Sequence, residues 1–143
     1  MLHPTLVSER KAKAMSFIYR NENPIKRNTN DCVIRAIATA MSRPWEDVYM
    51  DICRQGLLLF DMPSSNSTWE MYLLEHGYKK SLLPNTCPHC YTLDDFCDDF
   101  PFGTYVVATG SHVVAVVDGN YFDTANSGSE IVTYYFYKEE DFI

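Results

Sequence analysis

The chain has 143 residues, of which 46% are hydrophobic and 14% aromatic; this fits one folded domain and excludes a disordered chain. Its net charge is −7, so we expect no nucleic-acid partner. It has no apolar run of membrane-spanning length and no secretory signal. The five cysteines suggest no disulfide framework. We therefore expect a cytoplasmic protein with reduced thiols and no membrane association.

The basic residues are concentrated at the start of the chain. Residues 1–27 contain six basic residues and two acidic ones, which leaves the remainder strongly acidic. This segment is predicted to be a basic N-terminal arm with a short helix around residues 8–19. A single domain is expected to span residues 28–143.

Four helices and then four strands are predicted along the rest of the chain. The helices cover about residues 31–41, 45–54, 64–77 and 92–99. The strands cover residues 103–109, 112–117, 121–124 and 131–137. Asp118-Gly119 is a strong hairpin signal between the second and third strands. The predicted fold class is therefore α+β, with an N-terminal helical half packed on a C-terminal antiparallel sheet.

Cys32 lies at the start of the first predicted helix, with Asn30 or Asp31 as its N-cap. Unpaired backbone N–H groups and the positive end of the helix dipole favour a thiolate at this position. Arg35, one turn later, adds positive charge. Cys32 is therefore a candidate nucleophile, and a small buried residue of the core is the alternative.

His112 begins the strongly apolar strand that precedes the hairpin. A three-residue hairpin loop places Asn126 opposite His112, and a two-residue loop places Ala125 or Ser127 there instead. An amide or carboxylate beside the ring would fix its tautomer and orientation, as in a catalytic triad. Asn126 is the preferred third residue, and Asp123 is its rival.

Three motifs together resemble the papain-like cysteine peptidase superfamily: Asn-Asp-Cys32 opening an apolar helix, Gly-Ser-His112 opening a strand, and Asp-Thr-Ala-Asn126-Ser-Gly. The resemblance covers about residues 28–137 and is closest to small bacterial and phage-type relatives of the bacteriocin leader-processing (double-glycine) peptidases. It implies a papain-like fold with Cys32 as nucleophile, His112 as general base and acid, and Asn126 as orienting residue. It also implies a peptide or protein substrate, a thioester intermediate, and no metal or cofactor.

One part of the papain-like pattern is absent. That superfamily binds the oxyanion with a glutamine shortly before the cysteine, whereas this chain has Lys26 six residues before Cys32. Asn28 and Asn30 are the nearby amides, and Asn28 is preferred because Asn30 is a candidate helix cap. The alternatives are a deamidase or acyltransferase with the same triad, and a papain-like fold that only binds, such as a phage or mobile-element product acting on a host factor.

Cys87-Pro-His-Cys90 is a second cysteine motif. A zinc site needs four ligands, and only Cys97, His89 or Cys53 could add to this pair. A thioredoxin-like role requires a βαβ context that the chain lacks. We expect a loop with thiols and no metal site.

Overall fold

The structure, a computed structural model, describes residues 16–138. Within them, four helices and a six-stranded sheet form a mixed α+β fold, which confirms the predicted class. The helices are α2 (Cys32–Met41), α3 (Trp45–Leu59), α4 (Asn66–Glu75) and α5 (Leu93–Asp99). The strands are β1 (Phe17–Tyr19), β2 (Tyr78–Leu82), β3 (Thr104–Thr109), β4 (Val113–Val117), β5 (Asn120–Asp123) and β6 (Val132–Lys138).

The sheet has the strand order β1-β5-β4-β3-β6-β2. Its neighbouring strands are antiparallel except for β1 and β5, which are parallel. The prediction of an antiparallel sheet confined to the C-terminal half is therefore wrong at both edges. The strand β1 comes from the predicted arm, where a helix was expected, and β2 follows α4. The three residues of β1 are too few to show the alternation of a strand. Lys79 and Lys80 make β2 as polar as a typical loop.

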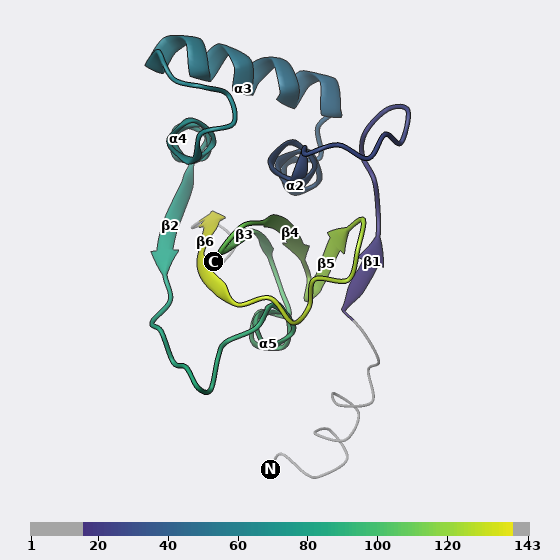
Figure 1. The fold of residues 1–143 in the computed structure, drawn as a ribbon, viewed down its shortest axis with the longest axis vertical. Helices are drawn as coiled ribbons and strands as arrows, with labels where there is room; N and C mark the ends of the chain where they lie inside the picture. Colours follow the sequence, from purple (N-terminus) through teal and green to yellow (C-terminus); the bar gives the residue numbers. More distant parts are fainter. Residues whose placement is uncertain (1–15, 139–143) are drawn as a thin grey trace.

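The helices cover the two faces of the sheet unequally (Figure 1). α2, α3 and α4 lie on one face and α5 lies on the other. On the first face, Ile37 and Trp69 pack in one core cluster with Val106 and Phe136 of the sheet. A second cluster around Phe96 lies under α5. Within residues 16–138, no helix combines the length and the hydropathy needed to cross a membrane.

The β4–β5 hairpin fixes the register on which the candidate site depends. Val117 pairs with Asn120, so the loop has two residues, Asp118 and Gly119. Both have positive φ, 50° and 78°, as a type I′ hairpin turn requires. Continuing this register by one step places Asp123 opposite Val114. Asp123 is therefore a diagonal neighbour of the position that His112 occupies, just before β4.

Candidate active site

Cys32 is the first residue of α2 and is half-buried. The first N–H groups of a helix have no acceptor within it, so they and the helix dipole are available to stabilise an anion here. Asp31 occupies the N-cap position but makes no side-chain cap bond. The predicted capping role is therefore not realised, because the Asp31 carboxylate is bound elsewhere.

His112 reaches Cys32 from the loop between β3 and β4. Cys32 and His112 line the same cavity, and the His112 imidazole and the backbone N–H of Val113 act on the Cys32 sulfur closely enough to lower the pKa of its thiol. His112 Nε2 lies 2.7 Å from an oxygen of Asp123, so Nδ1 is the ring nitrogen left to face Cys32. The structure thus brings together the predicted nucleophile and the predicted base.

Asp123, the last residue of β5, holds the other side of the imidazole. Its Oδ2 contacts His112 and also accepts a hydrogen bond from Ser127 Oγ at 2.7 Å. The backbone N–H of Thr124 donates to its Oδ1 at 2.8 Å. Burial acts to raise the pKa of Asp123, but the bonds from His112 and Ser127 outweigh it and hold the pKa at about 2. The carboxylate is therefore ionised, and its contacts fix its orientation.

Asn126, the preferred third residue, lies in a different hydrogen-bond network. Its Oδ1 accepts from Tyr121 Oη at 2.5 Å and from the backbone N–H of Gly128 at 3.0 Å. The physical reason is the two-residue hairpin loop: β5 ends at Asp123, and the chain then bends away from the strand register. Asp123, the rival named from the sequence, is the residue placed against His112.

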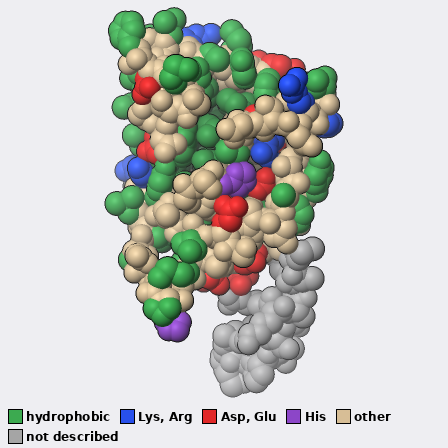
Figure 2. Space-filling model, in the orientation of Figure 1, with side chains coloured by type: hydrophobic (Ala, Val, Ile, Leu, Met, Phe, Trp, Pro, Cys, Tyr) green, Lys and Arg blue, Asp and Glu red, His purple; other side chains and the backbone are tan. Residues whose placement is uncertain are grey.

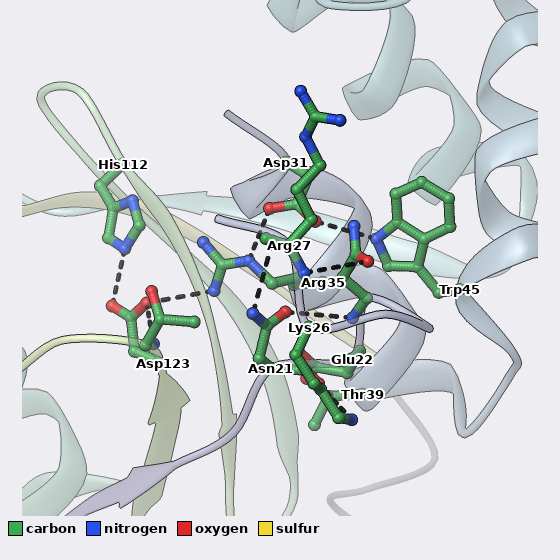
Figure 3. Close-up of polar contacts among 12 residues, drawn as sticks. Asn21, Glu22, Lys26, Arg27, Asp31, Arg35, Thr39, Trp45, His112 and Asp123 are labelled. Atoms are coloured by element: carbon green, nitrogen blue, oxygen red, sulfur yellow. Dashed lines mark hydrogen bonds and ion pairs between the residues drawn. The ribbon is translucent and has the colours of Figure 1, made fainter. Parts of the chain in front are cut away.

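A buried ion-pair network extends from Asp123 to the wall of the site (Figure 3). Arg35 donates to Asp123 Oδ1 at 3.3 Å and to Asp31 Oδ1 at 2.8 Å. The indole N–H of Trp45 donates to Asp31 Oδ2 at 3.0 Å. The side chains of Arg35, Asp31 and Asp123 are 9%, 6% and 3% exposed, so solvent screens these contacts little. The sequence suggested only that Arg35 adds positive charge; its bridging of two acidic residues requires tertiary contacts that no local pattern reveals.

The charges of the site favour a thiolate–imidazolium pair. The hydrogen bond to Asp123, followed by the bond to Cys32, raises the pKa of His112 to about 10. Burial acts to raise the pKa of Cys32, but the bonds from His112 and the Val113 N–H reverse this effect and lower it. Both directions favour the form of the pair in which His112 carries the proton and Cys32 is a thiolate.

The two candidate oxyanion amides lie in different places. Asn30 is exposed and lines the cavity beside Cys32. Asn28 lines a separate hollow with Arg27 and Asp31. Since Asp31 occupies the N-cap position, capping does not occupy the Asn30 amide. Of the two amides, Asn30 is therefore the one that shares a cavity with Cys32, whereas Asn28 was preferred from the sequence.

A cavity of about 500 Å³ opens beside Cys32 and His112. Aromatic and aliphatic side chains from α3, α4 and β6 form its wall: Trp45, Tyr49, Ile52, Trp69 and Tyr134. The rings of Trp45 and Tyr49 are stacked, with centroids 5.1 Å apart. Cys53 lines the same cavity from α3. The site can therefore hold an apolar group next to the thiolate.

Cys87 and Cys90 are joined in a disulfide within the loop after β2, which corrects the expectation of reduced thiols. Because both sulfurs are in the disulfide, neither can bind zinc as a thiolate. Among residues 16–138, no group of three or more His, Cys, Asp or Glu side chains is arranged to hold a metal ion.

Comparison of the chain with protein-family models, curated proteins and solved structures gives no significant match.

Proposed function

We propose that the chain is a papain-like cysteine peptidase in which Cys32 is the nucleophile, His112 the general base and acid, and Asp123 the orienting residue. The observation that carries the proposal is the arrangement of His112, which bonds to Asp123 through Nε2 and lies beside the Cys32 thiol, whose pKa it lowers. A cysteine at a helix N-terminus facing a histidine beside a strand of the packed sheet is also the arrangement that the superfamily resemblance implies.

The chemistry follows from the positions of these groups. The Cys32 thiolate attacks the carbonyl carbon of a peptide or amide, and the developing oxyanion is met by the Cys32 backbone N–H and the Asn30 amide. The His112 imidazolium gives its proton to the leaving amine, which leaves a thioester on Cys32. His112, now neutral, takes a proton from water as the water attacks the thioester. The acid product departs and the thiolate–imidazolium pair is restored.

A deamidase or acyltransferase remains an alternative, because both use the same thioester and differ only in the acyl donor or acceptor. A binding protein with a papain-like fold is the other alternative. This alternative is favoured by the oxyanion side of the site, which lacks the superfamily's glutamine. Asn30 is exposed, and Lys26 donates to the backbone carbonyl of Asn21 at 2.8 Å.

Competitive alkylation tests the proposal. Limiting iodoacetamide at pH 7 is expected to modify Cys32 well before Cys53, as read by peptide mass spectrometry. Cys53 is the matched control because it is also half-buried and lines the same cavity. His112→Ala is expected to abolish the preference, since it removes the cation beside the thiolate. Equal labelling of the two cysteines in the wild-type protein contradicts a catalytic cysteine and favours the binding protein.

A further inference from the structure

We propose that the site selects peptides with a bulky apolar side chain on one side of the scissile bond and an acidic side chain on the other. This inference rests on the proposed function, for which it names the substrate class. It derives from two hollows of opposite character that flank the start of α2. They share Thr29 and Asp31, the residue directly before Cys32.

The first hollow is the aromatic cavity described above. Away from Cys32 and His112, the charged side chain of its wall is Asp31, and that carboxylate is paired with Arg35 and bonded to the Trp45 indole. Figure 2 shows hydrophobic side chains gathered in a hollow of this face. A volume of about 500 Å³ is large enough for a Phe-sized or Leu-sized side chain, whose burial favours binding. A charged group in this cavity would lose its hydration without gaining a partner.

The second hollow has a volume of about 440 Å³ and is lined by polar residues, two arginines and one carboxylate: Asn21, Arg27, Asn28, Thr29, Asp31, Arg35 and Thr124. The charge of Arg35 is already balanced by Asp31 and Asp123. Arg27 is exposed, and its guanidinium points away from the buried network (Figure 3). Its backbone is held by Asn21 and Asn23, which fixes where the side chain leaves the loop. Arg27 is therefore positioned to pair with a carboxylate.

An extended peptide can place neighbouring side chains in the two hollows. Successive side chains of an extended chain point to opposite sides, and consecutive residues are about 3.3–3.6 Å apart. With the scissile carbonyl at Cys32, neighbouring residues of the substrate can enter the two hollows that meet at Asp31. The rest of the protein is strongly acidic and repels an acidic peptide. The acidic residue of the substrate is therefore expected to bind at Arg27, which fixes the direction of the peptide across the site.

Double-headed epoxysuccinyl probes, which carry one amino-acid residue on each arm, test this substrate class in either binding direction. Four probes combine Phe or Ser on one arm with Asp or Asn on the other. The rate of Cys32 modification by each probe is measured by intact-protein mass spectrometry and divided by the iodoacetamide rate of the same variant. Arg27→Glu and Tyr49→Ser change exposed or half-exposed side chains, one in each hollow, and circular dichroism checks that both variants fold.

The Phe/Asp probe is expected to react fastest. Replacing Ser by Phe should raise the normalised rate of Cys32 modification about tenfold or more, and replacing Asn by Asp should raise it about two- to fivefold. Arg27→Glu should remove the gain from Asp alone, and Tyr49→Ser should reduce the gain from Phe alone. Equal normalised rates for all four probes, with iodoacetamide still selective for Cys32, overturn the substrate class but not the cysteine site. Loss of iodoacetamide selectivity in the wild-type protein overturns the proposed function and this inference together.

Discussion

Asp123→Asn removes the charge that His112 faces while keeping an oxygen that can accept from the ring. The contact with Asp123 is the leading reason that the pKa of His112 stands at about 10 instead of 6.5. Without the carboxylate, we expect this pKa to fall toward its ordinary value. At pH 8 the protonated fraction of His112 then drops from nearly all molecules to about 3%, a decrease of about 30-fold. Cys32 loses the cation that lowers its own pKa, so its thiolate population falls as well.

The assay is the second-order rate of iodoacetamide alkylation at Cys32, measured by peptide mass spectrometry between pH 5 and pH 10. The wild-type rate is expected to be high already at neutral pH, whereas the Asp123→Asn rate should rise only at more alkaline pH. Asn126→Ala is the matched control, because Asn126 bonds to Tyr121 and Gly128; it should retain the wild-type profile. An unchanged profile for Asp123→Asn, or an altered one for Asn126→Ala alone, refutes the assignment of Asp123.

Three further predictions concern stability and turnover. The pKa of Asp123 is about 2 in the folded protein, against an ordinary value of 3.8. Ionised Asp123 therefore adds about 2 kcal/mol to the free energy of unfolding above about pH 4, and this stabilisation is lost as the pH falls through 2. Urea unfolding at several pH values should show this acid-induced loss of stability, and the loss should be smaller in Asp123→Asn. Asn30→Ala should lower the turnover of a cleaved peptide by about 10²–10³, and an unchanged turnover excludes this amide as the oxyanion donor. Thr92→Ala removes the reciprocal capping box of α5 and should lower the free energy of unfolding by about 1 kcal/mol; an equal urea midpoint contradicts this.

Elements with a strong local signal were predictable from the sequence. The apolar run after Asp31 indicated α2, and the change from a helical to an extended pattern after residue 101 indicated β3 to β6. The fourth helix was expected from residue 92, and Thr92 is the N-cap of α5, whose first-turn Asp95 completes the capping box. The edge strands were missed because their residues acquire strand character by pairing with a neighbour. β1 exists through its register with β5, and β2 through its register with β6.

The pairing of Cys32 with His112 was predictable because a helix start and a strand start are both visible as changes of period. For the third residue the sequence favoured Asn126 and named Asp123 as its rival, since the choice depends on one residue of hairpin length. Asp118 and Gly119 both adopt positive φ, as an Asp-Gly pair does in a two-residue type I′ turn, and this loop length places Asp123 near the ring. The Arg35 bridge joins side chains 88 positions apart in the sequence, a separation over which local patterns carry no information.

The central claim is that Cys32 forms a thioester which His112 then resolves. Intact-protein mass spectrometry after brief exposure to a p-nitrophenyl ester of an apolar acyl group tests it most directly. We expect one acyl group on the wild-type protein, located on Cys32 and lost within the time course. We expect none on Cys32→Ala and a persistent adduct on His112→Ala. An adduct that forms equally on Cys53, or one that the wild-type protein and His112→Ala release at the same rate, contradicts the claim.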